Sequence, residues 1–177
     1  MAQVPSPASL AAINEMDEAA FVGLLGGVFE HSPWVAQGAW PARPFASIDD
    51  LHRAMADVLD AADEAQKLAL LRAHPELAGR EAEAGTLTES STVEQSSAGL
   101  SALTHEEAVR IKALNVAYRA RFGFPFIIAV LNHTKESIFG ELERRLANDP
   151  ATELVTNLQQ VLTITRLRLD QLVAGAP

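Results

Sequence analysis

The sequence of 177 residues contains no cysteine. This absence excludes disulfide bonds, thiolate metal sites and thiol nucleophiles together, and it is compatible with a reducing compartment. Long apolar runs are missing as well, since the longest one, Phe124–Leu131, is far shorter than the roughly 20 residues of a membrane-spanning helix. We therefore expect a soluble protein that does not span a membrane.

Positive charge is scarce and scattered. The 14 Lys and Arg residues face 23 Asp and Glu residues, so the formal net charge is -9 and no basic surface is expected to bind nucleic acid or anionic membranes. The N-terminal residues 1–9 lack the basic and apolar regions of a secretory signal, and residues 174–177 are no peroxisomal address. These features favour a cytoplasmic location.

Short motifs of cofactor chemistry are also missing. The sequence has no G-x-S-x-G elbow, no Walker loop and no dinucleotide fingerprint. Its five histidines form no HxH or HExxH spacing; they are His31, His52, His74, His105 and His133. We therefore predict neither a metal site nor a cofactor.

The fold class follows from composition and periodicity. Hydrophobic residues make up 48% and charged residues 21%, which is typical of a globular domain. Helical spacing predicts helices over 17–30, 47–62, 68–74, 104–123 and 134–148, and a last helix that starts at Pro150. We predict an all-α, single-domain helical bundle with long irregular loops, in which a leader of residues 1–8 is disordered and residues 9–174 form the domain.

Three segments are predicted to be irregular. Residues 31–45 hold three prolines and two tryptophans and are expected to be a loop that packs onto the core. Residues 79–90 are small and acidic and are expected to be a mobile connection. Residues 126–131 have the composition of a strand, but a lone strand has no partner for a sheet.

His74 is the first candidate for chemistry, because it lies between an apolar helical run and Pro75. The residue before a proline is pushed out of the α region, so His74 is expected at or just past a helix end. An imidazole there can present a proton near neutral pH. The structural alternative is a histidine that bonds a carbonyl of the last helical turn.

Three further groups allow two interpretations each. Ser91 and Glu94 fit a capping box, as do Thr104 and Glu107, but a helix start also attracts an anionic ligand. The segment 121–129 is either a buried connector or irregular backbone that a bound polar molecule completes. Arg168 either leans toward the core, where it needs an anion, or extends to solvent.

Six blocks in this order resemble one family. They are Glu30-His31-Ser32-Pro33-Trp34, Arg43-Pro44-Phe45, His74-Pro75-Glu76-Leu77-Ala78, Ser91-x-x-Glu94-Gln95, Phe122-Gly123-Phe124-Pro125-Phe126 and Arg168-Leu169. The chain resembles the 2-oxo-4-hydroxy-4-carboxy-5-ureidoimidazoline (OHCU) decarboxylases of urate breakdown, over about residues 14–172. The resemblance implies a cofactor-free carboxy-lyase of purine metabolism, usually a homodimer, that forms (S)-allantoin and carbon dioxide.

The resemblance also assigns residues. It implies that His74 is the proton donor and that Glu94 and Arg168 complete the polar catalytic set. Around the substrate it places Pro75, Ser91, Glu94, Gln95, Phe126, Ile127, Ile128, Ala129 and Val130. Two alternatives remain at this point: a non-catalytic helical interaction module, and a decarboxylase of a related ureido or oxo acid.

Overall fold

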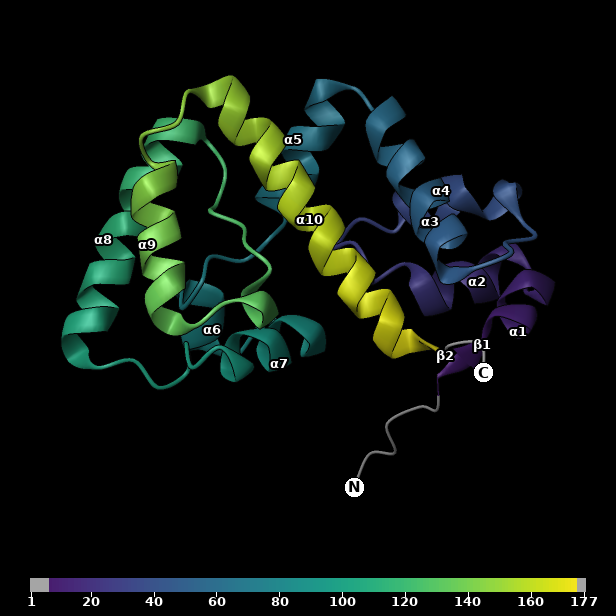
Figure 1. Cartoon of the computed structure of the whole chain (residues 1–177), viewed down its shortest axis with the longest axis horizontal. Coiled ribbons are helices and arrows are strands. Elements are labelled where there is room, and N and C mark those ends of the chain that lie inside the picture. Colours follow the sequence, from purple (N-terminus) through teal and green to yellow (C-terminus); the bar gives the residue numbers. More distant parts are fainter. Residues whose placement is uncertain (1–6, 175–177) are drawn as a thin grey trace. The chain divides into compact units, whose positions relative to one another are not determined.

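The computed structural model describes residues 7–174, and these form two compact units. One unit consists of the described residues up to Leu70 together with those from Leu162 onward, and the other is Leu71–Val161. The boundaries fall inside two helices, α5 (Glu64–Arg72) and α10 (Pro150–Leu172). The predicted all-α class is confirmed within residues 7–174, because helices form nearly all of the regular structure (Figure 1).

The first unit is built from short helices and one longer helix. They are α1 (Leu10–Glu15), α2 (Glu18–Leu25), α3 (Trp34–Ala39), the 3-10 turn η1 (Trp40–Ala42) and α4 (Ile48–Ala61). α4 begins at the predicted cap Ser47, whose hydroxyl accepts from the Asp50 N–H at 3.0 Å. Leu51, Met55 and Leu59 follow at four-residue spacing and are all buried, so α4 packs one apolar face inward, in part onto α3.

Three predictions in this unit were wrong in extent. The helix expected over 17–30 ends at Leu25, and the expected loop 31–45 contains α3 and η1. Short helices of this kind depend on packing partners that periodicity cannot reveal. The disordered leader was expected through Ala8, but Ala8 and Ser9 form strand β1, which pairs in parallel with β2 (Val173–Ala174). The parts of the terminal predictions on residues 1–6 and 175–177 lie outside the described residues.

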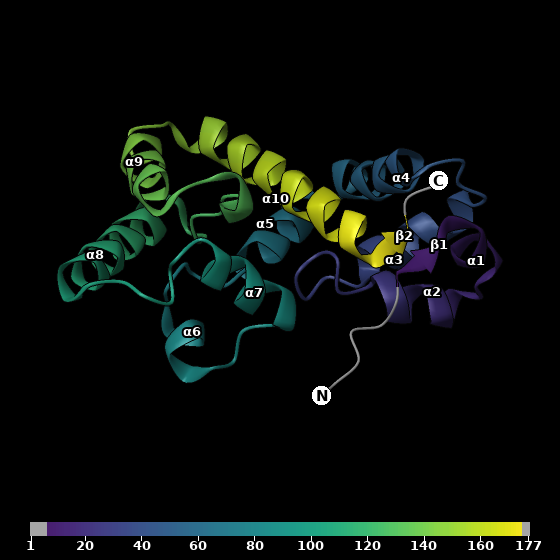
Figure 2. The same ribbon diagram turned by 60° about the horizontal axis from the view of Figure 1, so that its bottom comes forward.

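The second unit contains α6 (Arg80–Ala84), α7 (Glu89–Ser97), α8 (His105–Phe122), the 3-10 turn η2 (Val130–Asn132), α9 (Lys135–Arg145) and the first part of α10. α8 and α9 lie side by side in both views (Figures 1 and 2). The predicted capping box of Thr104 and Glu107 starts α8, and Gly123 in the left-handed conformation ends it. Thr134 caps α9, as predicted, but that helix ends at Arg145 rather than near Asn148.

The connection expected to be mobile contains the helix α6, which ends at Gly85 with a φ of 66°. The strand-like segment 126–131 forms no strand and passes into η2. No helix among the described residues is both long and apolar enough to cross a membrane.

Candidate active site

His74 lies two residues after the end of α5, with 7% of its surface exposed. Its N–H donates to the Leu71 carbonyl at 3.2 Å, so the chain leaves the helix in a tight turn at this residue, as Pro75 predicts. Arg72 anchors the end of α5, because its Nε donates to the Gly123 carbonyl at 3.0 Å. The prediction that His74 lies just past a helix end is confirmed, and the structure shows in addition that its side chain is buried.

The loop that follows His74 is held by two helices. From α7, Gln95 accepts from the Ala78 N–H at 2.9 Å, and its Nε2 lies 3.5 Å from the Glu76 carbonyl. From α8, Asn115 donates through Nδ2 to the Leu77 carbonyl at 2.9 Å. The backbone of residues 76–78 is therefore fixed from both sides, which limits the positions open to the imidazole.

Ala78 adopts a φ of +47°, a conformation that is costly for a residue with a Cβ. Gln95 stabilises it through the hydrogen bond to the Ala78 N–H. Backbone strain of this kind persists only where the surroundings enforce it, and it gathers at functional sites. His31, in the first unit, is the other positive-φ residue besides glycine within residues 7–174, and it too lies in a block that carries the family resemblance.

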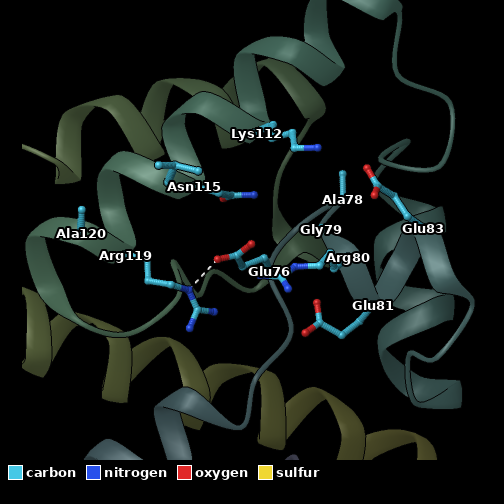
Figure 3. A pocket seen from close by; sticks show the side chains of 11 residues that line it. Glu76, Ala78, Gly79, Arg80, Glu81, Glu83, Lys112, Asn115, Arg119 and Ala120 are labelled. Carbon is cyan, nitrogen blue, oxygen red and sulfur yellow. Dashed lines mark hydrogen bonds and ion pairs between the residues drawn. The ribbon is translucent and has the colours of Figure 1, made fainter.

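An open pocket of about 610 Å³ lies beside this loop, between α6 and α8 (Figure 3). Arg119 reaches across it, and its Nε contacts the Glu76 carboxylate at 2.7 Å. Arg80 and Lys112 also line the pocket, but none of the predicted site residues does. The ion pair therefore fixes Glu76 at the edge of a pocket that His74 does not line.

Ser91 and Glu94 do not form the predicted capping box. α7 starts two residues before Ser91, and its cap is Thr88, whose hydroxyl accepts from the Ser91 N–H at 3.3 Å. The signal was misleading because the sequence offers several hydroxyl residues in succession at this point. Ser91, Glu94 and Gln95 instead lie within the helix at spacings of three and four, where side chains share one face.

That face is turned inward: Ser91 is 5% and Gln95 is 6% exposed, and Glu94 is half-buried. α7 also packs against η2, the turn that ends the predicted segment 126–130. The second unit therefore brings α7, the loop after His74 and the end of this segment together. A second pocket, of about 380 Å³, is lined by Gln95 with Thr92, Ser96 and Leu100.

The segment 126–130 is buried throughout, with exposed fractions of 2–4%. Side chains from the two later helices bind part of its backbone. Ile127 N–H donates to Asn157 Oδ1 at 3.1 Å, and Arg145 Nη1 donates to the Ile127 carbonyl at 2.8 Å. The sequence analysis missed Arg145 and Asn157, because a lone cation and a lone amide on helices carry no local signal of a buried role.

Arg168 lies in the first unit, near the end of α10, and only 5% of its side chain is exposed. Its Nη1 donates to Glu30 Oε2 at 2.8 Å and lies 3.3 Å from the Val28 carbonyl. Arg168 thus leans into the core and has a buried anion, so the alternative of a side chain extended to solvent is wrong. Glu30 belongs to the first of the six blocks, yet the sequence did not identify it as this partner.

Within residues 7–174, no group of three His, Asp or Glu side chains is arranged to hold a metal ion. The chemistry that the second unit offers is acid–base chemistry: a buried imidazole on a braced loop, with a half-buried carboxylate and polar side chains on α7. Such an arrangement can transfer a proton to or from a small polar molecule. The structure thus has the features of an all-α enzyme with an acid–base site.

The family model described as OHCU decarboxylase matches residues 14–170. The chain belongs to this family, whose members are carboxy-lyases. A relative from Haloferax volcanii, named 2-oxo-4-hydroxy-4-carboxy-5-ureidoimidazoline decarboxylase, is 41% identical over 92% of this chain and 95% of its own length. A mouse protein of the same name is 40% identical over 92% of each chain.

A solved structure is similar as well. The crystal structure of an (S)-allantoin synthase superposes with a TM-score of 0.73 at 32% sequence identity. The match covers 91% of this chain and 52% of the other, so this chain spans about half the length of that protein. The family resemblance and the all-α class predicted from sequence are both confirmed.

Proposed function

We propose that the protein converts OHCU to (S)-allantoin and carbon dioxide in urate degradation, without a cofactor and with His74 as the proton donor. The observation that carries the proposal is the buried imidazole of His74 at the start of a loop that α7 and α8 hold in a strained conformation. The family and the named relatives support the substrate. The name of the structural relative supports the product.

The reaction needs no external electron sink. When the bond to the carboxylate carbon breaks, its electron pair remains on the substrate and is delocalised by the adjacent C=N group. Carbon dioxide leaves in this step, and the ring then takes up one proton. The protein must orient the substrate, stabilise its changing charge and deliver that proton to one face, because unassisted decay gives racemic allantoin.

The family resemblance is the basis for the roles proposed for the remaining site residues. Arg168 holds the anionic substrate, and Glu94 binds the hydroxyl or ureido donors and orients His74. Pro75, Ser91, Gln95 and the backbone of 126–130 surround the ring.

The test is an assay in which uricase and hydroxyisourate hydrolase supply OHCU from urate while circular dichroism follows the allantoin. Wild-type protein is expected to accelerate the reaction and to produce a handed signal. His74→Ala is expected to lower turnover by about 10² to 10⁴-fold with unchanged far-ultraviolet dichroism. His105→Ala, on an exposed position of α8, is the matched control and is expected to keep wild-type turnover.

Each negative result has a distinct meaning. OHCU that decays at its spontaneous rate to racemic product in the presence of wild-type protein would refute the proposed function. Turnover of a related ureido or oxo acid in its place would support the alternative substrate. A His74→Ala variant with near wild-type turnover would remove His74 from the mechanism while leaving the reaction in place.

We also propose that the protein is cytoplasmic and, on the basis of the family resemblance, that it is a homodimer. Sedimentation velocity at micromolar concentration is expected to give a single species of twice the chain mass. A species of one chain mass across the same range would contradict the dimer.

A further inference from the structure

The segment Phe124–Val130 is bound to protein side chains along one side of its backbone. The Pro125 carbonyl accepts from Asn157 Nδ2 at 3.2 Å, and the Ile127 N–H donates to Asn157 Oδ1 at 3.1 Å. The Ala129 N–H donates to Gln160 Oε1 at 2.9 Å. One face of α10 therefore engages every second residue of the segment.

A buried network holds these side chains in place. Arg145, which also donates to the Ile127 carbonyl, forms an ion pair with Glu153 at 2.6 Å, and the two side chains are 1% and 0% exposed. The guanidinium donates to Asn157 Oδ1 at 2.6 Å. The Tyr118 hydroxyl hydrogen-bonds to the Glu153 carboxylate and accepts from Asn157 Nδ2 at 3.1 Å. Charged groups that are this deeply buried and fully paired leave the segment little freedom.

The hydrogen bonds alternate along the chain, as they do in extended backbone, where consecutive peptide groups point to opposite sides. Residues 125, 127 and 129 face the network. The N–H and carbonyl groups of Phe126 and Ile128 neither donate a hydrogen bond to nor accept one from any residue between 7 and 174. Both residues are nevertheless buried, with exposed fractions of 2% and 3%. Buried peptide groups without partners are costly, so a bound molecule that pairs with them would gain affinity.

We propose that Arg145, Asn157 and Gln160 are positioning residues that turn the peptide groups of Phe126 and Ile128 toward the substrate. The ring amides of OHCU offer both donors and acceptors, and a peptide N–H with its carbonyl matches such an amide. This inference rests on the proposed function, and it narrows the backbone contacts predicted over 126–130 to alternate residues.

Gln160 is the best position for a test, because it is half-buried and stands outside the charged network. Gln160→Leu keeps the size of the side chain and removes the acceptor of the Ala129 N–H. Gln160→Glu keeps an acceptor oxygen. Gln159→Leu makes the same change at the adjacent, exposed position and serves as the matched control.

We expect Gln160→Leu to raise KM for OHCU about tenfold and to lower kcat by less than about threefold, because a displaced binding segment weakens substrate contacts more than proton transfer. Gln160→Glu and Gln159→Leu should stay within about twofold of wild type in both constants. A purely structural role for Gln160 would lower the melting temperature and the active fraction without this selective rise in KM.

Hydrogen exchange gives a second readout that does not depend on turnover. Amides in 124–131 should exchange faster in Gln160→Leu than in Gln160→Glu, and saturating (S)-allantoin should slow them in wild type. Equal KM values and equal exchange in the two Gln160 variants would overturn the inference. If wild type has no activity on OHCU, the proposed function fails, and hydrogen exchange in the Gln160 variants still decides whether this side chain holds the segment.

Discussion

The ion pair between Glu30 and Arg168 allows stability and activity to be separated. Both side chains are almost fully buried, and Nη1 lies 2.8 Å from Oε2 across 138 residues of sequence. Glu30→Gln keeps the shape of the side chain but removes its charge. The guanidinium would then remain in the core without its anionic partner.

The size of the effect follows from this burial. Removing one partner of a buried pair destabilises a protein by about 3–5 kcal/mol, because the other charge stays desolvated. We expect about 3 kcal/mol here, at the lower end of that range, since the Val28 carbonyl still accepts from Nη1. For a chain of this length, such a loss lowers the melting temperature by about 6–12 °C.

Urea unfolding followed by circular dichroism measures this loss, and a double variant supplies the control. Arg168→Met alone should destabilise the protein comparably, because it strands the Glu30 carboxylate. Glu30→Leu combined with Arg168→Met should recover most of the stability, since an apolar pair of similar volume replaces a buried ion pair at little cost.

Activity should not recover with stability. If Arg168 holds the anionic substrate, Arg168→Met and the double variant should both raise KM about 10 to 10²-fold, the size of a lost charge-assisted hydrogen bond. A stable double variant with wild-type KM would refute the substrate role of Arg168. A loss below about 1 kcal/mol in Glu30→Gln would refute the argument from buried charge.

Three further predictions concern local features. Tyr118 is the single tyrosine of the chain, and burial together with its hydrogen bond to a carboxylate raises its pKa. Absorbance at 295 nm should therefore show no tyrosinate until the protein unfolds. The free energy of unfolding should fall as pH rises above about 10, because there the tyrosine loses its proton in the unfolded state alone. Burial lowers the pKa of His52, so the free energy of unfolding should decrease as pH falls below about 6.5. Urea titrations between pH 5 and 7 should show this dependence in wild type and a weaker dependence in His52→Gln. Thr88→Ala should lower the free energy of unfolding by about 1 kcal/mol, because it removes the cap of α7. Ser91→Ala should lower stability less and activity more. If Ser91→Ala were the more destabilising of the two variants, Ser91 would be the cap.

The sequence predicted best those elements whose signals are local. Ser47, Thr104 and Thr134 each cap the helix that they were expected to start, and Pro150 opens α10. A cap acts on backbone groups two or three residues away, so its effect is nearly independent of the rest of the fold. Where hydroxyl residues follow one another, as before α7, the same signal misplaced the start of the helix.

The short helices α1, α3 and α6 were not predicted, because isolated helices of five or six residues are unstable in water and form only where tertiary contacts stabilise them. Their existence is therefore a property of the packed units. The same holds for the strained conformation of Ala78, which Gln95 stabilises from another helix.

Composition and short-range pattern alone established that the chain is helical, that it has no thiol chemistry, and that His74 stands at a helix end before a proline. The folded chain decided which partners the buried polar groups have: Glu30 for Arg168, Asn157 and Arg145 for Ile127, and Thr88 rather than Ser91 for the start of α7. The physical reason is the distance along the chain over which each kind of interaction acts. A cap or a periodic stripe acts within a few residues, whereas a buried charge or peptide group pairs with whatever the packing brings to it from a distant part of the chain.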